Sequence, residues 1–313
     1  MKNLLITIIK YTLIGSVLYY IFSDLNFTLL KQAYHSYSIG WLFVAIGLVL
    51  GSDLILALRW RSLSQHACSL KASFESIVFS VFANTVLPAK LGEVAKLFYL
   101  KKLYNVKLTH GFSLMLTERF FDLLVLGILV VISAQLYWDD PKVQLIGWLM
   151  IASIILVFFL IKHPITRKLI HYIPTHFLRK WLVRLYHHFQ IVLAKESIIT
   201  LALWSILLWI SYLVTTMMFF ALVMGLNLTL EQLFIATIVS FIAFSIPLLP
   251  AGSGTFQAGI IFILTQYGIT KEEALVGSIV LQLIMVLPST LISFIILHNK
   301  SLSFHEFLGS DHE

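Results

Sequence analysis

Residues 231–254 read EQLFIATIVSFIAFSIPLLPAGSG. The run is apolar enough for a helix inside a bilayer, but Pro247 and Pro250 interrupt it, and proline breaks a helix. Gly252 and Gly254 follow, and a second apolar stretch continues over about 255–267. A short apolar segment broken by proline and glycine predicts a re-entrant hairpin, which enters the membrane and returns to its own side.

The same string occurs earlier in the chain. Residues 87–92 read LPAKLG and residues 249–254 read LPAGSG, which match as L-P-A-x-x-G. Each string follows a short apolar stretch, and each half of the chain has the order span, span, broken hairpin, span. Three crossings per half are odd, so the second half is inverted, which predicts an inverted repeat with halves of about 1–137 and 143–298. The alternative is that the string recurs by chance in a leucine-rich chain.

Composition points to the same class. The 313 residues are 59% hydrophobic and 12% charged, whereas a soluble domain is about a quarter charged. This excludes an ordinary soluble enzyme, and a lone Cys68 excludes an internal disulfide and any multi-cysteine metal site. Six stretches are apolar over the roughly 20 residues that a transmembrane helix needs. They are about 4–22, 39–58, 111–137, 143–162, 199–224 and 273–297.

The sequence therefore predicts an all-α polytopic membrane protein with about six full transmembrane helices and two re-entrant hairpins. We expect one transmembrane domain over 1–300 and a short cytoplasmic tail over 301–313. With the N-terminus inside, 17 of the 22 Lys and Arg residues lie on the cytoplasmic side and 3 lie outside. This bias predicts an inner (plasma) membrane protein with both termini in the cytoplasm. It accounts for the net charge of +7 without nucleic acid, because anionic lipids attract these residues.

One group of charges falls inside a predicted span. Glu118 and Asp122 lie four residues apart and share a helix face, near the start of the 111–137 span. Arg119 lies about 100° around the helix, and we expect it to pair with a carboxylate from another segment. Ionisable groups inside a membrane are costly and point to function. The alternative, an ion-pair network that locks helices together, is compatible with a functional role.

The two broken segments supply the other candidate residues. Helices that begin near Gly92 and Thr255 would present free backbone N–H groups, which bind anions such as phosphate. The alternative is that proline and glycine serve only to make tight hairpins. The candidate substrate-binding residues of the first segment are Asn84, Pro88, Lys90, Gly92, Glu93 and Lys96. Those of the second segment are Pro250, Gly252, Ser253, Gly254 and Gln257.

These motifs together resemble one family. Three motifs occur in order along the chain: L-P-A-K-x-G-E with a following lysine, then E-R-x-x-D, then P-x-x-P-x-G-x-G. This set is similar to the motifs of the lysylphosphatidylglycerol synthase transmembrane-region family of flippase-like integral membrane proteins. The resemblance covers roughly residues 5–298. It implies an inner-membrane helical bundle with re-entrant helices, which in some members is joined to an aminoacyltransferase domain and moves aminoacylated phospholipid between leaflets. Other members are linked to polyprenyl-phosphate carriers and envelope lipids.

The sequence departs from that pattern in three places. The chain stops at Glu313, so we expect no aminoacyltransferase domain and no enzyme activity of that kind. Gln257 stands where the family usually has an acidic residue, which argues against proton coupling or recognition of a cationic headgroup there. Lys90 stands where an arginine is common, which would replace a bidentate phosphate contact by a point charge.

We therefore expect a lipid translocase of the flippase type, which moves an anionic phospholipid or a polyprenyl-phosphate-linked lipid between leaflets. One alternative is a non-transporting membrane subunit that presents a lipid to a partner enzyme, and another is a secondary transporter of a small solute. The expected partners are membrane lipids and, in the subunit alternative, a lipid-modifying enzyme. No motif indicates a catalytic residue, a metal site or a cofactor.

Overall fold

The computed structural model describes most of the chain, and every regular element in the described residues is helical. It describes residues 12, 16, 19–23, 25, 26, 28, 29, 37–64, 68–87, 90–137, 141–172, 174–176, 179, 180, 182, 183, 186, 187, 198–246 and 250–302. Most of the predicted span 4–22 lies outside these residues, as does the candidate site residue Pro88.

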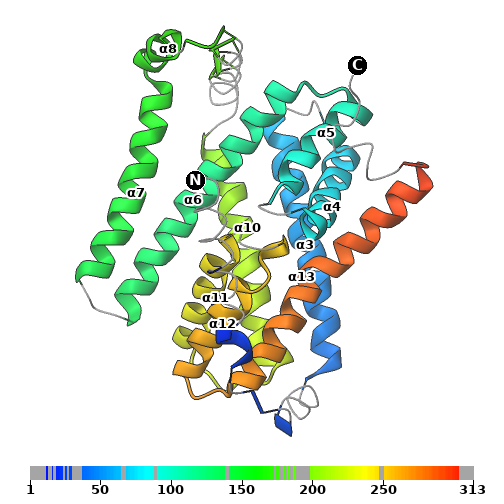
Figure 1. The fold of residues 1–313 in the computed structure, drawn as a ribbon, viewed down its shortest axis with the longest axis vertical. Helices are drawn as coiled ribbons and strands as arrows, with labels where there is room; N and C mark the ends of the chain where they lie inside the picture. Colours follow the sequence, from blue (N-terminus) through cyan, green and yellow to red (C-terminus); the bar gives the residue numbers. More distant parts are fainter. Residues whose placement is uncertain are drawn as a thin grey trace. The chain divides into compact units, whose positions relative to one another are not determined.

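Figure 1 shows the helices of the described residues. In chain order they are α3 (Ile39–Leu63), α4 (Leu70–Val86), α5 (Gly92–Tyr104), α6 (Leu108–Tyr137), α7 (Pro141–Lys162), α8 (Pro164–His171), α10 (Ile198–Met218), the π-helical turn η1 (Phe219–Val223), α11 (Leu230–Ser245), the 3-10 turn η2 (Pro250–Gly252), α12 (Thr255–Gln266) and α13 (Lys271–Asn299).

Three helices of the described chain are long and apolar enough to cross a membrane: Ile39–Leu63, Ile199–Val223 and Lys271–Asn299. They coincide with three of the six predicted spans and support an all-α membrane protein. Helices α6 and α7 form over the predicted 111–137 and 143–162 segments but are not among the three. The count of six spans stays a prediction.

The broken segments form helix, break and helix where the sequence predicts them. Helix α4 ends at Val86 and α5 begins at Gly92, while α11 ends at Ser245 and α12 begins at Thr255. At the fourth position of each L-P-A-x-x-G string the backbone is left-handed, with φ of 56° at Lys90 and 71° at Gly252. The two breaks therefore share a left-handed residue at this position, whereas at the last position Gly254 has a positive φ of 81° and Gly92 does not. The depth of the breaks in a membrane stays a prediction.

The described residues divide into two compact units. Unit 1 comprises those within Met1–Gly51, Val78–Val94 and Ser211–Asn299, and unit 2 comprises those within Ser52–Ile77, Ala95–Ile210 and Lys300–Glu313. Each unit takes segments from both predicted repeat halves. The units in space are thus not the two halves in sequence, and the inverted repeat stays a prediction.

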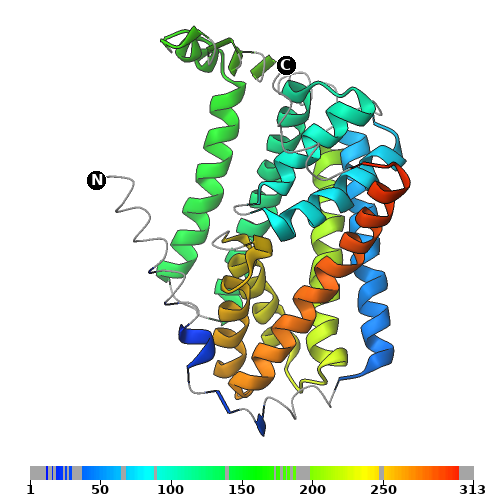
Figure 2. The ribbon, with the colours of Figure 1, turned by 45° about the vertical axis from the view of Figure 1, so that its right-hand side comes forward.

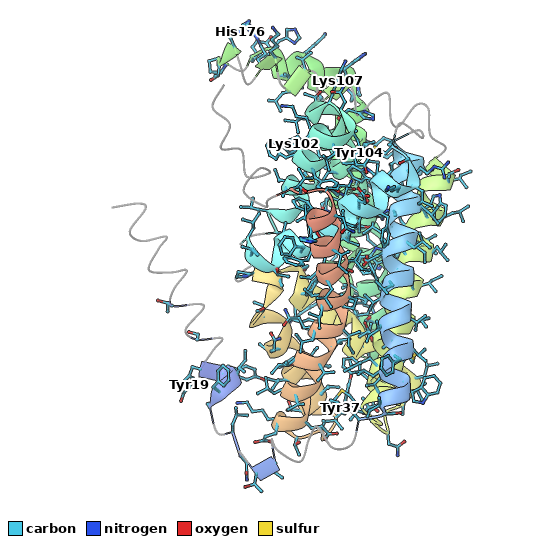
Figure 3. The ribbon with its side chains drawn as sticks, turned by 90° about the vertical axis from the view of Figure 1, so that its right-hand side faces the viewer. Tyr19, Tyr37, Lys102, Tyr104, Lys107 and His176 are labelled. Atoms are coloured by element: carbon cyan, nitrogen blue, oxygen red, sulfur yellow. The ribbon has the colours of Figure 1, made fainter. Side chains whose placement is uncertain are left out.

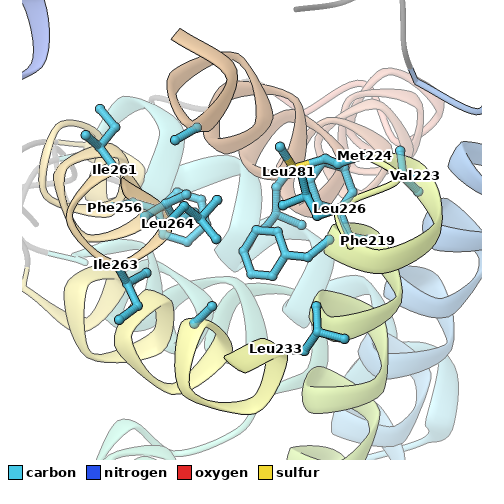
Figure 4. Close-up of a cluster of buried hydrophobic side chains, with 14 of the residues drawn as sticks. Phe219, Val223, Met224, Leu226, Leu233, Phe256, Ile261, Ile263, Leu264 and Leu281 are labelled. Atoms are coloured by element: carbon cyan, nitrogen blue, oxygen red, sulfur yellow. The ribbon is translucent and has the colours of Figure 1, made fainter. Parts of the chain in front are cut away.

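In unit 1, α12 packs against both α11 and α13 (Figures 1 and 2). Helix α11 begins with a capping box, in which Thr229 and Gln232 exchange side-chain and backbone hydrogen bonds. A Cβ atom added at Gly259 of α12 would lie 2.3 Å from the Cβ of Ala243, so glycine permits this close approach of α11 and α12. Figure 4 shows the apolar core around them. Its labelled members are Phe219, Val223, Met224, Leu226, Leu233, Phe256, Ile261, Ile263, Leu264 and Leu281.

In unit 2, α6 and α7 lie side by side as antiparallel neighbours (Figure 1). Its core forms around Trp60, which is fully buried, and includes Leu97, Leu114 and Phe121. Cys68 is also buried there, with 1% of its surface exposed. This packing places polar residues of α3, α5, α6 and α10 inside the unit.

Candidate functional site

The centre of unit 2 is Arg59 of α3, which is buried and bridges two carboxylates of α6. Its Nη1 lies 2.6 Å from Oδ1 of Asp122, and its Nη2 lies 3.1 Å from Oε1 of Glu118. Nη1 also donates to Oγ of Ser205 on α10, at 3.2 Å. One guanidinium therefore joins three helices, since its forked donors match carboxylate geometry.

Lys96 completes the buried part of this group. Its Nζ lies 3.2 Å from Oε2 of Glu118, so that Glu118 receives a cation on each oxygen. The same Nζ lies 3.6 Å from the centre of the Trp60 ring, a cation–π contact. Buried charges persist only when they are paired in this way.

Arg119 differs from the other cations in its exposure. Its side chain is 46% exposed, and its Nη1 lies 3.6 Å from Oδ2 of Asp122, three residues along the same helix. Asp122 thus faces two guanidinium groups: that of Arg59 is close and buried, and that of Arg119 is more distant and exposed. We call Arg59, Lys96, Glu118, Arg119 and Asp122 the charge cluster.

The charge cluster confirms that Glu118 and Asp122 share a helix face, but it adds a residue that the sequence did not reveal. Arg59 of α3 reaches both carboxylates from another segment. Arg119, which we expect from the sequence to pair with a carboxylate of another segment, lies beside Asp122 of its own helix. For Arg59 the sequence offers two equal alternatives, a pair with Asp53 or snorkelling of the long side chain to the interface. Ser205 was missed for a different reason, since a serine in an apolar helix gives no signal by itself.

In unit 1, the amide groups at the two helix starts are already engaged. Gly92 donates its N–H to Oδ1 of Asn84 at 2.8 Å, and Gly254 donates to Oε1 of Gln257 at 2.7 Å. At α5 the next two amides, those of Glu93 and Val94, bond to backbone carbonyls. At α5 the first three amides are therefore engaged by the protein's own side chains and backbone, and at α12 the amide of Gly254 is engaged by Gln257. Candidate residues Asn84, Gly92, Gly254 and Gln257 form caps.

Gln257 also begins a chain of side-chain amides. Its Nε2 donates to Oε1 of Gln282 at 2.6 Å, and Nε2 of Gln282 donates to the carbonyl of Ala251 at 2.9 Å and to Oγ of Ser253 at 3.2 Å. This amide network ties α13 to the loop before α12 with no charged group. Gln282 was not predicted, although a glutamine inside a predicted apolar span was the available signal.

The remaining predicted residues of the first segment lie close to these caps. Lys90 places its Nζ 4.9 Å from the centre of the Phe244 ring at the end of α11. Phe244 also lies against Gly252, where an added Cβ would be 3.1 Å from the Phe244 carbonyl oxygen. Glu93 lies in the first turn of α5, where a carboxylate suits the helix dipole.

The predicted site residues thus fall into two groups. Unit 1 holds Asn84, Lys90, Gly92, Glu93, Pro250, Gly252, Ser253, Gly254 and Gln257. Unit 2 holds Lys96, Glu118, Arg119 and Asp122. Within the described parts of the chain, no three His, Cys, Asp or Glu residues are placed to hold a metal ion.

A second polar cluster of unit 2 was not predicted as a site. The buried carboxylate of Glu75 on α4 accepts hydrogen bonds from Tyr99 at 2.9 Å, from Tyr104 at 2.6 Å and from Lys300. Figure 3 shows Tyr104 near Lys102 and Lys107, where α5 leads into α6. Burial alone would raise the pKa of Glu75, but the bonds from Lys300, Tyr104 and Tyr99 outweigh it and hold the pKa below its usual value.

Comparison with known proteins places this architecture among membrane proteins. A family model described as "Lysylphosphatidylglycerol synthase TM region" matches residues 7–293. A UPF0104 membrane protein of Methanocaldococcus jannaschii is 30% identical over 210 residues, which cover 65% of this chain and 88% of that protein. A second UPF0104 membrane protein, from Methanothermobacter thermautotrophicus, is 29% identical over 128 residues, which cover 40% of this chain and 38% of that protein.

Proposed function

The chain belongs to the lysylphosphatidylglycerol synthase transmembrane-region family, and from this premise we propose that it moves an anionic lipid between the leaflets of the inner membrane. The lipid is a phospholipid or a polyprenyl phosphate, whose phosphate binds at the charge cluster of unit 2. The proposal assigns no catalytic reaction to the chain. Membership of the family and the membrane-length helices support a membrane role, and the charge cluster supports the anionic headgroup.

The observation that carries the proposal is the double pairing of Asp122. Its close partner is the buried Arg59 at 2.6 Å, and its distant partner is the exposed Arg119 at 3.6 Å. When Arg119 turns to a lipid phosphate, Asp122 keeps the Arg59 pair and is not left as an unpaired buried charge. Arg119 can therefore exchange a carboxylate for a phosphate at low cost, which a solitary ion pair could not do.

Arginine suits this exchange chemically. Its guanidinium binds phosphate through two parallel N–H groups and stays charged at any physiological pH. The acyl chains would stay in the bilayer while the headgroup crosses. Since no nucleotide-binding motif occurs in the sequence, we propose that movement follows a lipid or ion gradient or depends on a partner.

The proposal retains the predicted membrane arrangement: six spans, two re-entrant hairpins in an inverted repeat, and both termini in the cytoplasm. Two features that the breaks have in common support the repeat. Lys90 and Gly252 have left-handed backbones at the same position of the string, and Gly92 and Gly254 at the last position each donate to a side-chain amide oxygen.

The test is leaflet exchange in proteoliposomes. Fluorescent analogues of phosphatidylglycerol, phosphatidylethanolamine and a polyprenyl phosphate are each bleached from one side, with protein-free liposomes as background. We expect exchange of an anionic analogue by the wild type, its loss in Arg119→Ala, and its retention in Lys180→Ala, which removes an exposed positive charge outside the charge cluster.

Equal rates in both variants would remove the role of Arg119. A folded wild-type protein that binds the lipid but exchanges none would favour the non-transporting subunit that serves a partner enzyme.

A further inference from the structure

Unit 1 contains an open pocket of about 460 Å³ beside the loop before α12. Thr85 of α4 lines it together with Pro250, Ala251 and Ser253 of the loop before α12, and α13 forms the rest of the wall. The volume lies in the range of small-ligand sites in proteins. The pocket thus brings the end of α4, at the first L-P-A-x-x-G string, next to the second string within one unit.

The polar groups of this pocket are all neutral. Ser253 and Gln282 line it together with Thr85, and the described residues that line it include no charged side chain. Gln282 already donates both N–H groups, to Ala251 and Ser253, and its oxygen accepts from Gln257. Ser253 accepts a hydrogen bond from Gln282, and the O–H group of Ser253 can still donate one. The pocket therefore offers a neutral donor that suits an oxygen acceptor on a ligand.

The mouth of the pocket continues into a lipid-facing surface. Ile279 and Leu283 line it from α13, and 43% and 53% of their surfaces are exposed. Leu287 and Leu291 extend the same exposed stripe along α13, a helix of membrane-spanning length. Such a stripe faces acyl chains in a bilayer. A lipid can therefore enter sideways, with its chains along α13 and its polar part in the pocket.

We propose that this pocket binds the glycerol and ester region of a membrane lipid, with an ester carbonyl accepting a hydrogen bond from Ser253. This assignment rests on the proposed function, to which it adds a second, uncharged recognition element in unit 1. A phosphate would lack a counter-charge among the lining residues, and the nearby helix-start amides of Gly92 and Gly254 are capped. An ester carbonyl needs only the neutral donor that the pocket provides.

The experiment is photolabelling of the full chain in nanodiscs with two probes. One is diacylglycerol that carries a diazirine near an ester carbonyl, and the other is phosphatidylglycerol with the same diazirine. We expect both to label peptides of 250–257 or 279–286, because the phosphate is not what the pocket recognises. Labelling of these peptides by phosphatidylglycerol alone, or labels confined to other peptides, would overturn the assignment.

Two variants locate the contact. Ser253→Ala should lower diacylglycerol labelling about fivefold, the effect of one neutral hydrogen bond on affinity. Leu283→Trp should block the mouth and remove most of the labelling, while Leu291→Trp, on the same stripe and 54% exposed, should retain it. Equal labelling of the two tryptophan variants would contradict a pocket site.

Leaflet exchange measured in parallel separates this inference from the proposed function. Intact exchange of phosphatidylglycerol without labelling of the pocket would overturn the pocket assignment alone. Labelling of the pocket by both probes without exchange would overturn translocation and retain the binding site.

Discussion

Removal of Arg59 should destabilise unit 2 more than removal of any exposed charge. In Arg59→Met the carboxylates of Glu118 and Asp122 lose the cation that bridges them at 3.1 and 2.6 Å. Breaking a buried ion pair from one side costs about 3–5 kcal/mol, and here two carboxylates lose their common cation while Glu118 keeps Lys96 and Asp122 keeps the longer pair with Arg119. At about 2–4 °C per kcal/mol for a unit of this size, the midpoint of unfolding should fall by roughly 6–20 °C.

The chain carries its own reporter for this measurement. Cys68 is the single cysteine and lies buried in the core of unit 2, so a thiol-reactive dye reports when that core opens. The dye is followed during heating of the purified protein in detergent. The matched control is Arg61→Met, which removes the same charge two residues along α3 while leaving the charge cluster intact.

We expect Arg61→Met to lower the midpoint by only about 2 °C, because this half-buried side chain lies outside the charge cluster. A second variant, Arg59→Met with Asp122→Asn, should recover part of the loss, because Glu118 keeps its Lys96 partner and residue 122 no longer carries a charge that has lost its close partner. If Arg59→Met unfolds at the wild-type midpoint, the ion pairs at Arg59 do not hold unit 2 together.

Two further predictions concern packing and pH. Gly259→Leu should lower the unfolding midpoint by several degrees, because an added Cβ there lies 2.3 Å from the Cβ of Ala243. Gly47→Leu is the control, since an added Cβ there meets open space, and its midpoint should stay unchanged. Similar midpoints for the two variants would refute the close packing of α11 and α12. The folded pKa of Glu75 lies below its unfolded value of about 4.3, so its contribution to stability is present above that pH and is lost as the pH falls through the folded pKa. Unfolding midpoints between about pH 6 and pH 3.5 should therefore fall less steeply in Glu75→Gln than in the wild type, and identical slopes would rule out this linkage.

The helices were predictable because apolar length and proline position are local properties. The short apolar stretch before LPAKLG became α4, the quoted stretch from 231 became α11 as far as Ser245, and 255–267 became α12 within a residue. Each of these segments starts or ends at a signal that the chain itself carries, such as Pro247 or Gly254. No tertiary contact was needed to place them.

The contacts within the sites were not predictable in the same way. Glu118 and Asp122 could be placed on one face because they share a helix, but Arg59 reaches them from a segment about 60 residues earlier. The spacing likewise gave no sign that Asn84 and Gln257 fold back to accept hydrogen bonds from the amides of Gly92 and Gly254, and phosphate binding at the two helix starts stays a prediction. Spacing shows where a polar side chain lies on its helix, but it does not show which partner reaches it.

In the proposed function a lipid phosphate replaces Asp122 at Arg119. The most direct measurement is the affinity with which the Asp122→Asn variant binds phosphatidylglycerol in nanodiscs. Removing the competing carboxylate should tighten binding about tenfold, the scale of one charge-assisted hydrogen bond. The matched control is Asp53→Asn, which removes another buried carboxylate of unit 2 and should change the affinity little. Unchanged or weaker binding by a folded Asp122→Asn protein would contradict the account.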